Sequence, residues 1–166
     1  MNVLRVSRWP VVLLLGWIGG WAVDASLVVA EEASPAELAQ QLRSDDADIR
    51  RAALEKLAAH PDQARQVFPD LIKRFRDPVP ELRVLAAKAV AGTGEAGQKW
   101  LPHFVRLFHD HDTMPDDKPV SYHVARIVGQ VMGKAVLDDL IALLKEGDVS
   151  ARRGACVAIY ETGPEA

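Results

Sequence analysis

The amino-acid sequence predicts an all-α fold, an α-α superhelix or solenoid of about four stacked helical hairpins. From Ser34 onward, apolar residues recur at helical spacing, and each apolar run ends at a Gly, Pro or Asp turn signal. Ala and Leu dominate while aromatic residues make up only 6%, which favours closely packed helices over a β-sandwich. The same helix and turn pattern returns after 33 residues between its first two occurrences, as in repeat proteins.

The first 30 residues are typical of a secretory signal peptide. Arg5 and Arg8 form a basic start, residues 11–23 are apolar, and small residues allow cleavage after Ala30, with Ala25 as a second possible position. The apolar stretch is 13 residues long, which is short of the roughly 20 residues that a membrane-spanning helix needs. We therefore expect an exported protein, periplasmic or extracellular, and an uncleaved N-terminal anchor is the disfavoured alternative.

Charge and cysteine content exclude several classes of protein. The formal charge is −3, and without residues 1–30 it is −4, because 18 of 20 basic and 22 of 23 acidic residues remain. This mildly acidic balance provides no basic surface for nucleic acid. The single cysteine, Cys156, excludes an internal disulfide and a Cys-based metal site. Its apolar neighbours predict an inert core residue. Because a disulfide and a Cys-based metal site are excluded, stability must come from packing.

The individual helices are predicted from their start and stop signals. Ser34 and Glu37 can form a capping box, with Pro35 at the first helical position. Pro78 and Pro80 force a turn after the third helix, because the residue before a proline resists helical geometry. No sustained period-two segment indicates a strand. The expected helices cover residues 34–43, 48–59, 63–75, 81–91, about 100–108, 120–132, 136–145 and 149–161.

The helices superimpose as four repeat units within residues 34–166. The units cover about 34–63, 64–97, 98–135 and 136–166. In three of them an apolar residue precedes an arginine of the second helix by eight positions, in the pairs Leu42 and Arg50, Phe75 and Arg83, and Leu144 and Arg152. The third unit has Tyr122 where the arginine is expected, and its extra residues form a polar loop at 110–119.

This pattern of an apolar helix, an Asp turn and a helix that begins near apolar-Arg and ends in Gly resembles the HEAT-repeat family in its short bacterial form. It is similar to the repeats of phycobilin lyase proteins. Residues 75–78, 81–94 and 144–163 match best, and the resemblance covers 34–166. It implies that acidic turn residues and second-helix arginines form a ladder between neighbouring units. The implied ladder residues are Asp45, Arg50, Asp77, Arg83, Asp148 and Arg152. An anion-binding row of arginines is the functional alternative.

One cluster has the residue types of a metal site. His109, His111, Asp112 and His123 could bind zinc or a similar divalent ion. The alternative is a solvated loop in which histidines favour the negative end of a helix. We assign no metal site and expect no cofactor. His-Glu pairs, haem-attachment motifs, Gly-rich phosphate loops and nucleophile–base pairs are missing from the sequence, so we expect no enzyme.

We therefore expect an exported, non-enzymatic protein-binding or scaffolding module. Stacked hairpins leave a curved surface for partners, and the loop at 110–119 is the best candidate for a partner contact. Its alternative is a tolerated insertion without a partner. Two other functions stay open: a HEAT-like small-molecule or metal-binding protein of lyase type, and the N-terminal part of a larger secreted protein.

The last predicted helix is expected to present an apolar face. Val157, Ile159 and Tyr160 lie on it, and no further repeat follows to cover them. A solenoid normally closes with a polar capping repeat. We expect the array to continue in a longer chain or this end to pair with another chain.

Overall fold

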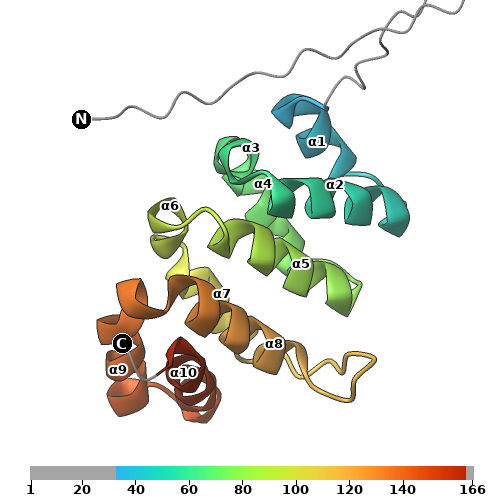
Figure 1. Ribbon diagram of the computed structural model, residues 1–166. Coiled ribbons are helices and arrows are strands. Elements are labelled where there is room, and N and C mark those ends of the chain that lie inside the picture. Colours follow the sequence, from blue (N-terminus) through green and yellow to red (C-terminus); the bar gives the residue numbers. More distant parts are fainter. Residues whose placement is uncertain (1–32, 164–166) are drawn as a thin grey trace, which may run out of the picture. The chain divides into compact units, whose positions relative to one another are not determined.

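Stacked helical hairpins make up the part of the chain that the computed structural model describes, residues 33–163 (Figure 1). The predicted signal peptide lies outside the described residues. Within them, the only β-type pairing is an isolated bridge between Thr113 and Pro119. The predicted all-α solenoid is therefore confirmed.

The helices follow one another in the order that the repeat pattern predicts. In the first half the bounds are α1 Pro35–Gln41, α2 Ala47–Ala59, α3 Pro61–Gln66, α4 Phe68–Lys73, the 3₁₀ helix η1 Arg74–Arg76 and α5 Pro80–Ala91. In the second half they are α6 Glu95–Gln98, α7 Leu101–Leu107, α8 Val120–Ile127, the π-helical turn η2 Val128–Met132, the 3₁₀ helix η3 Gly133–Val136, α9 Leu137–Glu146 and α10 Val149–Thr162.

Side-chain caps begin three of these helices, and the first of them is the capping box that the sequence predicts. Ser34 and Glu37 form the expected capping box, in which the Ser34 N–H donates to Glu37 Oε2 at 2.8 Å and the Glu37 N–H donates to Ser34 Oγ at 3.3 Å. Asp46 caps α2 by accepting from the Asp48 N–H at 2.8 Å. Asp148 caps α10 in the same way, through the Ala151 N–H at 2.9 Å. These contacts satisfy backbone donors that a helix start leaves free.

Prolines divide the first helices of the units more finely than expected. The prediction of one helix over 63–75 is wrong, because Val67 has φ −119° and ψ 21° and separates α3 from α4. Pro69 lies in the first turn of α4, where its missing N–H costs nothing. Pro102 has the same position in α7, which the short helix α6 precedes. The helix expected over 120–132 is α-helical only as far as Ile127.

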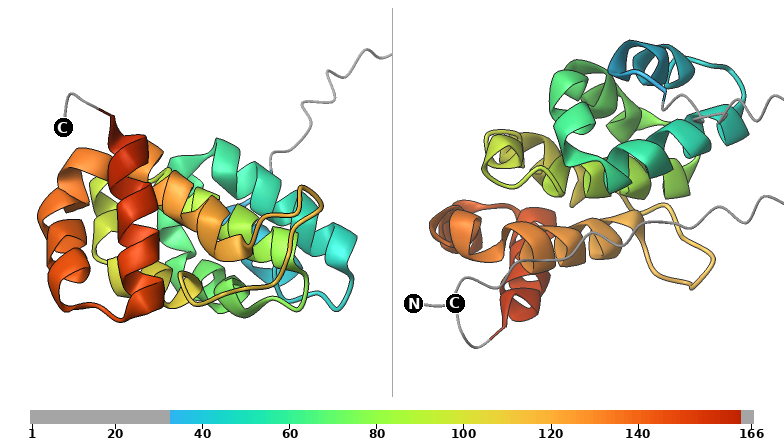
Figure 2. Two further views of the ribbon diagram at one scale, coloured as in Figure 1. Left: turned by 90° about the horizontal axis from the view of Figure 1, so that it is seen from below. Right: turned by 45° about the horizontal axis from the view of Figure 1, so that its top comes forward.

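The second helices of the units form a continuous layer. α5 packs between α2 and α8, and α8 packs in turn on α10 (Figures 1 and 2). Helices α4, α7 and α9 pack on α5, α8 and α10 respectively. Buried apolar residues from Leu38 to Ala158 form one cluster along the stack. A contact between units within it joins Phe75 to Phe104, whose ring centroids lie 5.2 Å apart. The core is thus a shared seam between neighbouring units, as expected for a solenoid.

A glycine allows a close approach between helices in the last two units. A Cβ added at Gly129 would lie 2.8 Å from Glu161 Cβ and would overlap the backbone oxygen of Ala158. Gly129 therefore lets the end of α8 and η2 lie directly against α10. Any larger residue must push the two helices apart.

We expect Gly129→Ala to lower the free energy of unfolding by about 1–3 kcal/mol, because the added methyl group overpacks this contact. Urea unfolding followed by circular dichroism measures the change. Val131 is 48% exposed two residues further on, so Val131→Ala is the control and should change stability by less than about 0.5 kcal/mol. Equal effects of the two substitutions would contradict the assigned close approach.

Candidate functional site

The turns between first and second helices are joined by buried arginines. Arg50 donates from Nη1 to the carbonyl oxygens of Ser44 and Asp45, both at 2.9 Å. Its Nε and Nη2 donate to Asp77 Oδ2 and Oδ1 at 2.8 and 3.0 Å. The two side chains are only 5% and 0% exposed. Arg50 thereby joins the turn of its own unit to the turn of the next. Asp45 takes part through its backbone carbonyl.

The carboxyl group of Asp77 is held in its ionised form. Burial disfavours the charge. This effect is outweighed by hydrogen bonds from Arg50 and the Val79 N–H and by the charges of Arg50 and Arg74. The pKa of Asp77 therefore lies below its ordinary value. This contribution to stability is complete above the pKa of the unfolded chain. It is lost as the pH falls through the lower pKa of the folded protein.

Arg83 repeats this arrangement one unit further along. Its Nη1 donates to the Asp77 carbonyl oxygen at 2.8 Å, and its Nε lies 2.8 Å from Asp110 Oδ2 in an ion pair. Its Nη2 contacts both Asp110 and Asp112. Asp110 is not among the predicted ladder residues. The available signal was its position 33 residues after Asp77, which matches the first repeat interval.

The third and fourth units depart from the ladder. Tyr122 stands where an arginine would bind the next turn, and His109 binds that turn instead, with Nε2 2.8 Å from Asp148 Oδ2. The hydrogen bond that the imidazole donates to the Asp148 carboxylate raises the pKa of His109 above its ordinary value. Arg152 donates to the carbonyl oxygen of its own turn, Gly147, at 2.8 Å, and its side chain is exposed. It contacts no carboxylate of the described residues.

The loop at 110–119 is an ordered hairpin. The Met114 N–H donates to the Lys118 carbonyl oxygen at 2.8 Å, and the Asp117 N–H donates to that of Met114 at 3.0 Å. Asp117 has φ +62°, which an aspartate at a tight turn tolerates better than most residues. The Val120 N–H closes the base of the loop on the Asp112 carbonyl oxygen at 2.9 Å. The loop extends beyond the start of α8 (Figure 2).

The metal-ligand types of this region do not converge. His109 binds Asp148, His123 Nε2 lies 3.0 Å from Asp116 Oδ1, and Asp112 binds Arg83. His111 is exposed. Among residues 33–163, no group of three or more His, Cys, Asp or Glu side chains is placed to hold a metal ion. Three of the four candidate ligands are thus engaged in separate pairs.

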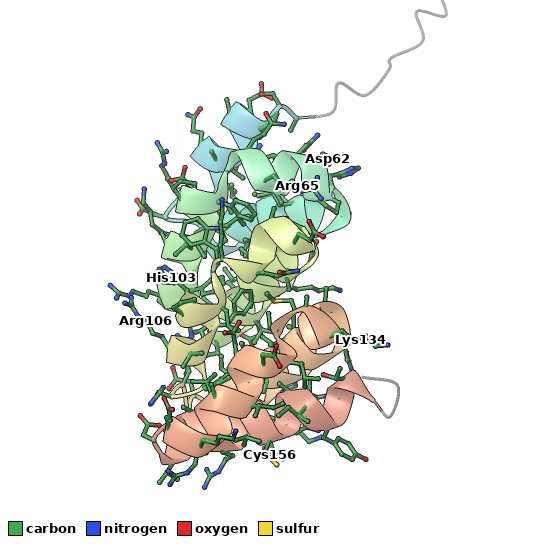
Figure 3. All side chains as sticks on the ribbon, turned by 90° about the vertical axis from the view of Figure 1, so that its left-hand side faces the viewer. Asp62, Arg65, His103, Arg106, Lys134 and Cys156 are labelled. Atoms are coloured by element: carbon green, nitrogen blue, oxygen red, sulfur yellow. The ribbon has the colours of Figure 1, made fainter. Side chains whose placement is uncertain are left out.

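The expectation that Cys156 is a core residue is wrong. Its side chain is exposed on the outer side of α10 (Figure 3). The apolar neighbours Ala155 and Ala158 are fully buried, while Val149 and Tyr160 are 63% and 83% exposed. The apolar residues around Cys156 did not reveal which side of α10 packs on other helices and which side is exposed.

A groove of about 720 Å³ lies where α4, η1 and α7 meet the turns of the second and third units. Basic and imidazole side chains from both units line it, and the start of the loop at 110–119 adjoins them. These side chains are Lys73, Arg76, Arg83, His103, Arg106 and His109. His103 and Arg106 project to the same side of the molecule (Figure 3). The groove and the hairpin loop together form the candidate binding site.

Burial and nearby charge affect the imidazole in this groove. Burial lowers the pKa of His103, and the positive charges of Arg106 and Arg76 lower it further. A group with a lowered folded-state pKa stabilises the fold above its unfolded pKa, and the contribution is lost as the pH falls. His103 is therefore neutral near pH 7.

The fold and the ladder define an α-helical repeat protein with charged contacts between successive turns. Residues 35–115 match the family model described as HEAT repeats, which supports assignment to the HEAT-repeat family. No curated protein matches the chain. HEAT repeats suggest a helical scaffold or protein-binding module. Of the helices within 33–163, none has the length and hydrophobicity to cross a membrane.

We expect Arg50→Met to lower the free energy of unfolding by about 3 kcal/mol, because it leaves the Asp77 carboxylate buried without its main partner. Arg43 provides a matched control, since it also binds a carboxylate of the next unit, Asp70, but is 64% exposed. Arg43→Met should cost less than about 1 kcal/mol. Denaturant unfolding measures both, and similar losses would contradict a ladder based on buried pairs.

Proposed function

We propose that this protein is an exported, non-enzymatic scaffold that binds another protein at the candidate binding site. The supporting observation is an open groove next to a projecting hairpin loop, with both fixed to the rigid stack by Arg83. Because Arg83 holds Asp110 and Asp112, the loop base is ordered before a partner binds. Preorganisation of this kind reduces the entropy lost on binding.

The exposed side of α10 is proposed as a second contact surface. Its support is the combination of exposed Val149 and Tyr160 with the guanidinium of Arg152, which binds only its own turn within the described residues. Aromatic and arginine side chains are the types most enriched at the centres of protein interfaces.

Export makes a specific prediction about the mature N-terminus. When the full chain with a C-terminal tag is produced in a bacterial host with a general secretory pathway, we expect the tagged protein outside the cytoplasm and beginning at Glu31. Cell fractionation and N-terminal sequencing test this. Retention of the intact N-terminus in the cytoplasmic fraction would contradict export.

Partner binding is tested by pull-down from the envelope fraction of the native cell, with mass spectrometry of the captured proteins. Replacing the exposed loop residues Thr113, Pro115 and Lys118 by alanine should reduce capture of a specific partner several-fold. Glu55→Ala with Lys56→Ala, on the exposed side of α2, is the control and should leave capture unchanged. Tyr160→Ser tests the second surface in the same assay. Equal capture by all variants would contradict both proposed surfaces.

A further inference from the structure

The outer edge of the first two units contains an ion pair that is complete within the chain. Arg43 donates to both carboxylate oxygens of Asp70, from Nε at 3.2 Å and from Nη2 at 3.0 Å. Lys73 Nζ lies 3.1 Å from Asp70 Oδ1. One carboxylate therefore lies between two cations, and the hydrogen bond from Arg43 lowers the pKa of Asp70.

The next pair of units repeats these positions without the carboxylate. The start of α4, Phe68-Pro69-Asp70, aligns with the start of α7, Leu101-Pro102-His103, at the 33-residue repeat interval. Pro69 and Pro102 share the first turn of their helices, and Leu71 and Phe104 are both fully buried. In this register Arg76 replaces Arg43, His103 replaces Asp70 and Arg106 replaces Lys73.

The two cations of the second set lack an internal acid. Arg76 and Arg106 are exposed, and neither has a carboxylate within ion-pair distance among residues 33–163. Both line the groove with His103, and their charges act on its imidazole. The carboxylates of the groove, Asp110 and Asp112, already bind Arg83. The groove therefore presents positive charge at the position where the preceding units hold an aspartate.

We propose that Arg76, His103 and Arg106 bind a carboxylate of an acidic segment of the partner protein, which takes the position that Asp70 occupies one unit earlier. This inference rests on the proposed function, because it names the chemistry of the partner. Guanidinium groups bind carboxylates through paired hydrogen bonds, and a partly buried imidazole adds a donor when the approaching negative charge favours its protonation. The repeat itself thus provides the template for the ligand.

The test measures binding of a fluorescent peptide of alternating Glu and Gly residues to residues 32–166, whose described part, 33–163, lies within one compact unit. His103→Asp supplies the missing carboxylate from within the chain and should weaken binding about tenfold or more, as should Arg106→Gln. Arg43→Gln removes another exposed arginine, one whose carboxylate is already provided within the chain, so the peptide affinity of this variant should stay within about twofold of the unchanged protein.

A second measurement separates local binding from general charge attraction. Titration of the His103 ring signals by NMR should show a higher pKa with the peptide bound, because an added negative charge favours the imidazolium. Thermal melting of each variant establishes that it is folded. Equal peptide affinity of all variants, an Arg43→Gln loss as large as that of Arg106→Gln, or an unchanged His103 pKa would overturn the proposal. Binding of inorganic phosphate without binding of the peptide would overturn the acidic-segment assignment.

The outcomes distinguish this inference from the proposed function. A partner captured from the envelope fraction equally well by the unchanged protein and by His103→Asp would leave the scaffold function standing and overturn the carboxylate site. Specific peptide binding, combined with no captured partner, would support the site and count against the scaffold function.

Discussion

The structure depends above all on the buried contact among Arg50, Asp77 and Arg83. Asp77 accepts from Arg50 through its carboxylate and from Arg83 through its backbone carbonyl, so one turn is fixed by arginines of two successive second helices. Each arginine also binds the backbone of its own turn. A buried ion pair with fixed hydrogen-bond directions specifies one register, because a displaced pair would leave a charge buried without its partner.

The same contact connects the fold to the candidate binding site. Arg83 is the last arginine of the buried ladder, and its partners Asp110 and Asp112 are the first residues of the loop that departs from the repeat length. The insertion therefore starts from a fixed base rather than from a mobile turn. Beyond it, the imidazole of His109 replaces the guanidinium in binding the next turn, at Asp148. Protonation of that imidazole strengthens this contact. Its contribution to stability is complete below the ordinary pKa of histidine and is lost as the pH rises through the raised pKa of His109.

Equivalent positions of successive units differ in charge at the groove. In the first two units, Arg43 meets an acid of the next unit, Asp70. At the equivalent position one unit later, His103 replaces the aspartate, while both cations remain as Arg76 and Arg106. The change removes an internal neutralising charge without disturbing the buried residues beside it, since Phe104 packs fully in the core. Exposed charges near a preformed groove contribute to steering and specificity for a charged partner more than to the fold.

The sequence by itself determined the helical repeat architecture and the Ser34 capping box, because helix periodicity and capping depend on residues a few positions apart. The ladder was implied by the resemblance to HEAT repeats, and Arg50, Asp77 and Arg83 form it. Only the tertiary structure decided that Asp110 and Asp112 bind Arg83, that His109 binds Asp148, and that Cys156 is exposed. These outcomes depend on which faces of different units meet, and the pairs that they join lie 27 to 39 residues apart. Over such separations, packing of the preceding units places the side chains, and local pattern does not specify their partners.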